Sequence, residues 1–180
     1  WEGLPNYNDL FHIERNLPAN YLFLKNMIQN GLQNLTVIGT CFEYGLQSGK
    51  LSEDTPPHPV TAYGLAKDCL RKFLVELQKH EKFSLKWVRL FYLYGEGQNE
   101  KSLFGQLDKA IIEKESIFNM SGGEQLRDYL PVDRVAEYIA AIALQDGVVG
   151  VVNCCSGKPV SVRRLVENYV REKGAGIKLN

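Results

Sequence analysis

The sequence lacks long apolar runs and lacks a surplus of charge of either sign. No segment of its 180 residues is apolar enough over a sufficient length to span a bilayer, so the sequence predicts no membrane helix. Lysine plus arginine and aspartate plus glutamate number 21 each. This balance argues against a broad electrostatic surface for nucleic acid or for anionic lipid.

Cysteines are few, and none has a spacing typical of a metal site: Cys41, Cys69, Cys154 and Cys155. Cys154 and Cys155 are adjacent, which suits neither a zinc finger nor a mutual disulfide bond. We therefore predict that no metal is bound, that the thiols stay reduced, and that the protein is cytoplasmic. We also expect no signal peptide.

Short apolar runs alternate with segments of helical periodicity, and an apolar content of 44% supports a globular core. Helices are expected at 16–30, 61–80, 103–113, 132–144 and 160–172, and strands at 35–38, 85–90 and 148–153. Ala136, Ile139, Ala140 and Ala143 are expected on the inner face of the fourth helix. Strands separated by helices of this length need crossover connections, so we predict an α/β fold with a parallel sheet.

The spacing Tyr-x-x-x-Lys occurs three times, at Tyr21/Lys25, Tyr63/Lys67 and Tyr169/Lys173. Only Tyr63 opens a predicted helix after a proline-rich loop, and only it is preceded by a strand that ends in a hydroxyl residue, Thr40. Residues four apart share one face of a helix. A nearby ammonium lowers the pKa of a phenol, so such a pair can move a proton on or off an alcohol. The alternative is a surface tyrosine beside a solvated lysine.

A series of further motifs occurs in one order along the chain: Asn16, Thr40-Cys-Phe-Glu-Tyr44-Gly45, Glu53, Pro59, Tyr63-Gly-x-x-Lys67, Arg89, Tyr94-Gly95-x-Gly97-Gln98, Arg127-Asp128-Tyr129, Val132-Asp133 and Asn153-x-x-Ser156-Gly157. In this order the chain resembles the extended short-chain dehydrogenase/reductase family, in particular its NAD-dependent epimerase/dehydratase group, which acts on nucleotide sugars. The resemblance implies a Rossmann-like doubly wound parallel sheet. Residues 1–100 would belong to the NAD(P)-binding domain, and residues 101–180 to part of a substrate-binding lobe interleaved with the last strand and helices of that domain.

The resemblance also implies roles for residues near the cofactor. Tyr63 would be the acid/base, Lys67 would hold the nicotinamide ribose and lower the pKa of Tyr63, and Thr40 would orient the substrate oxygen. Asn16 matches an asparagine near the cofactor, with a helix N-cap as the alternative. Phe91 matches a residue packed on the nicotinamide, with an ordinary core phenylalanine as the alternative.

Two more positions match residues that contact the substrate. Arg127 matches an arginine that binds the nucleotide diphosphate, and a structural salt bridge with Asp128 or Asp133 is the alternative. Tyr92 stands where many epimerases have an asparagine near the substrate phosphates. The identity of the nucleotide sugar is therefore left open.

The chain departs from the family in two further respects. Family dehydratases carry Asp-Glu after the threonine, where this chain has Cys41 and Phe42, so a 4,6-dehydratase is not expected. Cys41 is either a second acid/base or a small packing residue. The glycine-rich turn that cradles a dinucleotide pyrophosphate is absent. We therefore expect an interior fragment of a longer enzyme, inactive by itself, and the sequence does not decide between NAD and NADP.

These observations predict an oxidoreductase that acts on C4 of a nucleotide sugar, as a 4-ketoreductase or a 4-epimerase. The rival interpretation is a non-catalytic binding or regulatory protein on the same scaffold. Family members often dimerise through two helices of each subunit. Here these would be the helices at 16–30 and 61–80, although packing against the sheet explains most of the same apolar residues.

Overall fold

A computed structural model describes residues 5–180, which fold as two compact units. The first unit holds the described residues up to Phe91 together with Val135–Cys154, and the second holds Tyr92–Arg134 and Cys155–Asn180. The first unit is therefore built from two separate stretches of the chain. Which unit binds cofactor and which binds substrate remains a prediction.

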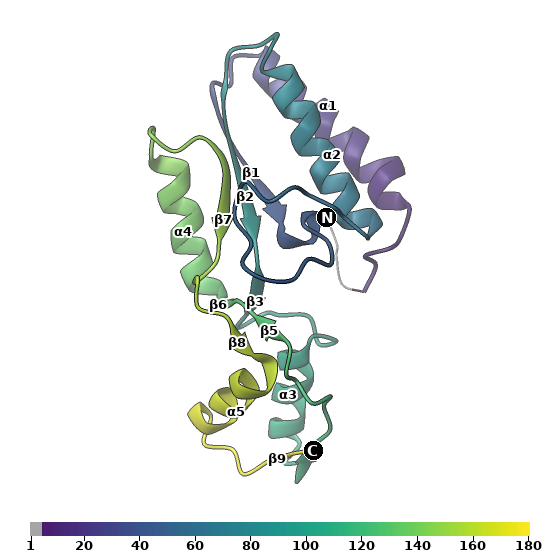
Figure 1. Cartoon of the computed structure of the whole chain (residues 1–180), viewed down its shortest axis with the longest axis vertical. Helices are drawn as coiled ribbons and strands as arrows, with labels where there is room; N and C mark the ends of the chain where they lie inside the picture. Colours follow the sequence, from purple (N-terminus) through teal and green to yellow (C-terminus); the bar gives the residue numbers. More distant parts are fainter. Residues whose placement is uncertain (1–4) are drawn as a thin grey trace. The chain divides into compact units, whose positions relative to one another are not determined.

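A three-stranded parallel sheet forms the centre of the first unit (Figure 1). Its strands are β1 (Asn34–Thr40), β2 (Ser84–Leu90) and β7 (Gly150–Cys154), in the order β1-β2-β7. Thr40 lies opposite Leu90, and Leu90 lies opposite Cys154, so the three carboxyl ends meet at one end of the sheet. The predicted α/β fold with a parallel sheet is confirmed.

Helices cover both faces of this sheet (Figure 1). A π-helical turn, η1 (His12–Asn16), leads into α1 (Leu17–Gln29), which packs with α2 (Ala62–Leu77) on one face. α4 (Val132–Leu144) covers the other face. The core on the first face consists of the buried residues Leu17, Ile28, Leu35, Ala66, Leu70, Leu74, Leu77, Leu85 and Trp87.

Neighbouring residues of β2 serve the two faces, because side chains alternate along a strand. Trp87 is fully buried in the core beneath α2. Lys86 points the other way, and its Nζ donates hydrogen bonds to the carbonyl oxygens of Ala143 and Gln145 at the end of α4. A lysine in this position satisfies the last carbonyls of a helix and opposes its dipole.

The inner face predicted for α4 is correct at Ile139 and wrong at its three alanines. Val135 is buried, and Ile139 and Ile142 are half-buried, whereas Ala136 and Ala140 are exposed, as is Ala143. The buried positions follow the spacing i, i+4 and i+7. Branched side chains remove more apolar area from water than alanines do, so the face that carries them packs inward.

The second unit contains two helices and three pairs of short strands. α3 (Leu103–Ile112) and α5 (Val162–Glu172) enclose a core that includes Phe104, Leu107 and Val166. The strand pairs are β3 (Tyr92–Tyr94) with β6 (Tyr129–Pro131), β4 (Ile117–Phe118) with β9 (Lys178–Leu179), and β5 (Leu126–Arg127) with β8 (Val160–Ser161).

Serine caps begin both helices of this unit. Ser102 Oγ accepts the N–H of Gly105 at 3.0 Å, and Ser161 Oγ accepts the N–H of Arg164 at 3.2 Å. Within residues 5–180, no helix combines the length and the apolar character needed to cross a membrane.

Candidate active site

Tyr63 and Lys67 lie one turn apart at the start of α2. Thr61 caps this helix, since its Oγ1 accepts the N–H of Gly64 at 3.1 Å. The N–H of Tyr63 donates to the carbonyl of Tyr7 at 2.9 Å. The first turn of α2 is thus held both by its own cap and by the segment that precedes η1.

Thr40 reaches the same place from the end of β1. Its hydroxyl accepts the N–H of Phe42 at 3.3 Å and forms a hydrogen bond with the side chain of Tyr63. Lys67 Nζ donates to the carbonyl of Ile38 at 2.8 Å and lies 6.0 Å from the centroid of the Tyr63 ring. The structure therefore brings Thr40, Tyr63 and Lys67 together at the carboxyl end of the sheet, where parallel sheets bind ligands.

Burial sets the protonation of the two titratable groups. It raises the pKa of Tyr63 to about 12, and the hydrogen bond from Thr40 opposes this rise. Burial also lowers the pKa of Lys67 to about 8, against the attraction of the Glu43 carboxylate. The expected lowering of the tyrosine pKa by Lys67 is not found, because desolvation of the phenolate outweighs the other influences and the ammonium is bonded to the carbonyl of Ile38.

Replacing Lys67 by methionine should stabilise the folded chain. The fall in the pKa of Lys67 from 10.5 to about 8 means that the charged side chain destabilises the folded state by about 3 kcal/mol at neutral pH. Methionine cannot donate the hydrogen bond to Ile38, and this loss lowers the stability of the variant by about 1 kcal/mol. We expect Lys67→Met to raise the free energy of unfolding by about 1–2 kcal/mol at pH 7, measured by urea denaturation.

The pH dependence of the free energy of unfolding distinguishes the loss of a buried charge from a change in packing. Between pH 8 and 10.5 the unfolded wild-type chain holds a proton that folded Lys67 has lost, so wild-type stability rises with pH and the advantage of the variant disappears. Lys25→Met, in the second Tyr-x-x-x-Lys pair, is the control and should follow the wild-type pH profile. If the free energies of unfolding of Lys67→Met and wild type differ by a constant amount from pH 7 to 10.5, the buried charge of Lys67 is not the cause of the difference.

Glu43 is a buried carboxylate at this site to which the sequence analysis gave no role. It ends the short helix η2 (Cys41–Glu43), and its Oε1 accepts the N–H of Thr40 at 2.9 Å. Trp87 Nε1 donates to it at 2.9 Å, and Arg89 Nε donates at 2.8 Å. The spacing Thr-x-x-Glu is the sequence signal of such a capping box, and it could have identified Glu43.

Arg89 in turn connects Glu43 to Tyr44. Its guanidinium carbon lies 4.4 Å from the centroid of the Tyr44 ring. The Tyr44 hydroxyl donates to Asn153 Oδ1 at 2.7 Å. Arg89 and Glu43 are both almost fully buried, so the pair is a charge network beneath the carboxyl ends of the strands.

Asn16 lies in η1 and stands at the N-cap position of α1, as the alternative predicts, but its side chain makes no capping hydrogen bond. Its Nδ2 lies 3.3 Å from His12 Nδ1, and the His12 ring stands edge-on to that of Tyr63 with centroids 5.2 Å apart. Asn16 thus approaches Tyr63 through a buried histidine. Phe91 follows β2, is partly exposed, and lies 6.3 Å from the Tyr44 ring.

Tyr92 and Arg127 belong to the second unit and lie next to each other there. The guanidinium carbon of Arg127 is 5.5 Å from the centroid of the Tyr92 ring. The salt bridge considered for Arg127 is absent from the part of the chain that the structure describes. Asp128 instead accepts the N–H groups of Ser156 and Gly157, both at 2.8 Å. The substrate-binding roles of Tyr92 and Arg127 remain predictions.

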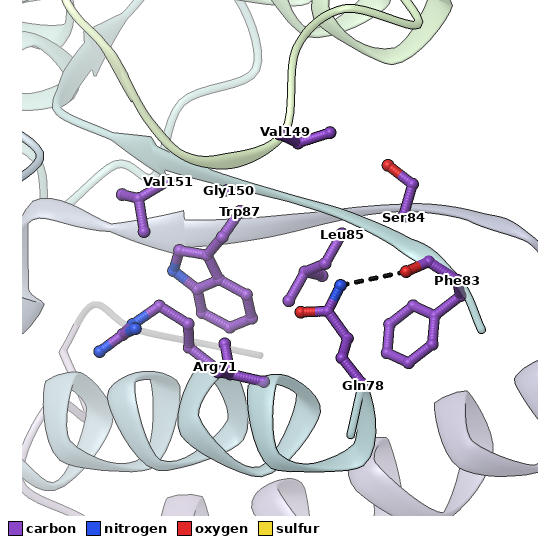
Figure 2. Close-up of a pocket in the computed structure, with 10 residues that line it drawn as sticks. Arg71, Gln78, Phe83, Ser84, Leu85, Trp87, Val149, Gly150 and Val151 are labelled. Carbon is purple, nitrogen blue, oxygen red and sulfur yellow. Dashed lines mark hydrogen bonds between the residues drawn. The ribbon is translucent and has the colours of Figure 1, made fainter. Parts of the chain in front are cut away.

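A pocket of about 490 Å³ lies elsewhere in the first unit, between α2, β2 and β7 (Figure 2). Its lining is mostly apolar, and Gln78 Nε2 at its rim donates to the carbonyl of Phe83 at 3.0 Å. None of the predicted site residues lines it. Trp87 connects it to the network around Glu43, because its ring lines the pocket while its Nε1 bonds Glu43.

Over residues 5–180, no cluster of three or more His, Cys, Asp or Glu side chains is arranged to hold a metal.

Comparison with known proteins gives one family. A family model described as the NAD dependent epimerase/dehydratase family matches residues 7–155. The chain is 32% identical to dTDP-6-deoxy-L-talose 4-dehydrogenase (NAD(+)) of Aggregatibacter actinomycetemcomitans, covering 99% of this chain and 66% of that protein. It is 25% identical to GDP-6-deoxy-D-talose 4-dehydrogenase of the same organism, covering 91% of this chain and 56% of that protein. The chain thus spans about half to two thirds of the length of these relatives.

A solved structure agrees. MoeE5 in complex with UDP-glucuronic acid and NAD superposes with a TM-score of 0.77 and 25% identity, over 91% of this chain and 56% of MoeE5. The parallel sheet with helices on both faces is therefore Rossmann-like.

Proposed function

The chain belongs to the NAD-dependent epimerase/dehydratase family, and we propose that its protein is an oxidoreductase acting on C4 of a nucleotide sugar. The observation that carries the proposal is the hydrogen bond between Thr40 and Tyr63, with Lys67 one turn further along α2. Two relatives that act at C4 of 6-deoxytalose nucleotides support this choice.

The residues present fit a nicotinamide cofactor, NAD or NADP, in part. A phenol, an ammonium and a hydroxyl meet at the carboxyl end of the sheet, and Phe91 directly follows the neighbouring strand β2. Lys67 would hold the ribose of the cofactor, with Asn16 and Phe91 alongside. When bound, the cofactor supplies or accepts a hydride. The glycine-rich turn that would cradle its pyrophosphate is not in this chain.

The chain's own residues move the accompanying proton. The hydroxyl of Thr40 accepts the N–H of Phe42, so its hydrogen is directed to the tyrosine oxygen or to a substrate oxygen beside it. Because the pKa of Tyr63 is raised to about 12, the phenol keeps its proton at neutral pH. A protonated phenol can donate to a C4 carbonyl oxygen, which suits reduction of a 4-keto sugar. We therefore favour a 4-ketoreductase, or 4-dehydrogenase, over a 4-epimerase as the activity of the protein.

The test uses the full-length protein of the reading frame that contains this chain. We expect it to interconvert the 4-hydroxyl and 4-keto forms of a deoxy nucleotide sugar, with reduced cofactor formed or consumed in proportion to product. A 4-epimerase would invert C4 without net change in cofactor. The absence of both reactions across dTDP-, GDP- and UDP-sugars would contradict the proposal. The 180-residue chain by itself should be inactive.

The protein acts in the cytoplasm on a nucleotide-sugar substrate whose diphosphate contacts Arg127. It also dimerises through α1 and α2, because Leu22, Phe23 and Phe73 on these helices are 63%, 62% and 46% exposed. Sedimentation of the full-length protein as a monomer at micromolar concentration would contradict the dimer.

A further inference from the structure

One side of the candidate active site is aromatic. The rings of Tyr7 and Phe42 stack, with centroids 4.7 Å apart and planes at 21°. Their centroids lie 5.8 and 6.1 Å from that of Tyr63. Both side chains are only partly buried, so they offer ring surface beside the reacting tyrosine. Tyr7 and Phe42 are called the aromatic wall below.

Backbone hydrogen bonds fix the aromatic wall to the residues that move the proton. The N–H of Phe42 donates to Thr40 Oγ1 at 3.3 Å, and the carbonyl of Tyr7 accepts the N–H of Tyr63 at 2.9 Å. Gly64 lets the loop approach closely, since a Cβ at this position would lie 2.5 Å from the carbonyl oxygen of Phe42. The wall therefore keeps its place relative to Thr40 and Tyr63.

A substrate oxygen bound by Thr40 and Tyr63 brings its sugar against this wall. The inference rests on the proposed function, in which that oxygen is on C4. Of the two carbons next to C4 in a hexose, C3 bears a hydroxyl, whereas C5 bears C6. The C6 group is a methyl in a 6-deoxy sugar and a hydroxymethyl in the parent sugar. An aromatic ring face favours the methyl, because a hydroxyl against it loses water and gains no comparable hydrogen bond.

We propose that Tyr7 and Phe42 select 6-deoxyhexose nucleotides over the corresponding hexose nucleotides by packing against C6. Apolar pockets discriminate only modestly against an added hydroxyl, so we expect a ratio of kcat/KM values of roughly 10 to 100 in favour of the 6-deoxy substrate. Phe42 is the residue expected to contribute most, since its ring has no polar group of its own.

The experiment measures this ratio in the full-length protein. The two substrates share the nucleotide and the configuration at C2 to C5, and differ only in methyl against hydroxymethyl at C5. Variants Phe42→Ser, Phe42→Leu and Tyr7→Phe are compared with wild type. A ratio of kcat/KM values does not depend on the fraction of active protein, so partial unfolding of a variant leaves it interpretable.

The proposal expects Phe42→Ser to reduce the ratio to within about threefold of unity. Phe42→Leu, which keeps an apolar side chain, should retain most of the preference, and so should Tyr7→Phe, which keeps the ring. Equal wild-type rates on both substrates, or a preference that survives in Phe42→Ser, would overturn the proposal. If wild type acts on no nucleotide sugar at C4, the proposed function itself fails, and that outcome is distinct from a lost preference.

Discussion

Tyr63→Phe should lower kcat for C4 oxidation or reduction about 10³-fold in the full-length protein. The variant keeps the ring that packs against Tyr7, Phe42 and His12 and removes only the hydroxyl that bonds Thr40. Proton transfer to the C4 oxygen then depends on water. Substrate affinity should change little, so the loss is expected in kcat and is measured from initial rates of cofactor reduction.

Tyr21→Phe is the matched control for this substitution. Tyr21 heads the Tyr21/Lys25 pair with the same spacing, and its ring stands edge-on to Phe73 with centroids 5.5 Å apart. Tyr21 lies on α1 and is not part of the proposed relay. Removing its hydroxyl should therefore leave kcat within a factor of about two of the wild-type value, as is typical of changes away from a site. Equal activity of Tyr63→Phe and wild type would contradict the acid/base role proposed for Tyr63.

Glu43→Gln should destabilise the first unit by about 3–5 kcal/mol, the cost of breaking a buried ion pair from one side. Glu43 is fully buried, and the substitution leaves the Arg89 guanidinium buried without its carboxylate. It also weakens the acceptor for the N–H of Thr40. The free energy of unfolding by urea, followed by tryptophan fluorescence, measures the loss, since Trp87 itself bonds Glu43.

A double variant and a surface control make this test specific. Glu43→Leu combined with Arg89→Met removes both charges and should recover much of the stability lost in Glu43→Gln, since apolar replacements of buried pairs are often tolerated. Glu76→Gln removes an exposed carboxylate that pairs with Lys79 at 2.6 Å, and it should leave the unfolding midpoint unchanged. If the urea unfolding midpoint of Glu43→Gln equals that of wild type, the buried Glu43–Arg89 pair does not stabilise the first unit.

The elements of the first unit could be predicted because their signals are local. The apolar periodicity of α2 and the branched residues of β1 lie within single stretches of sequence, as does the spacing that identifies Tyr63 and Lys67. The short strands of the second unit were not predicted. β4 and β9 contain two residues each and pair Ile117 with Lys178, so their signal is the pairing itself and not the local sequence.

The electrostatics of the site needed the structure. The sequence predicts that Lys67 lowers the pKa of Tyr63, but burial raises this pKa, and burial depends on η1, η2 and the segment around Tyr7. The role of Glu43 also depends on partners distant in sequence, since Trp87 and Arg89 reach it from β2. Spacing and sequence context predict which tyrosine and lysine form the proposed relay, whereas their environment comes from tertiary packing.

The pairing of β2 with β7 has a consequence for how the protein folds. Lys86 lies opposite Gly150, and the whole stretch Tyr92–Arg134 of the second unit intervenes between the two strands. During synthesis β1, α2 and β2 emerge before β7 and can form their local contacts, but β7 can pair with β2 only after this stretch has left the ribosome. Closing so long a loop carries an entropic cost before any strand contact repays it. Until then the edge of β2 is unpaired, and the nascent chain is most exposed to misassociation in that interval.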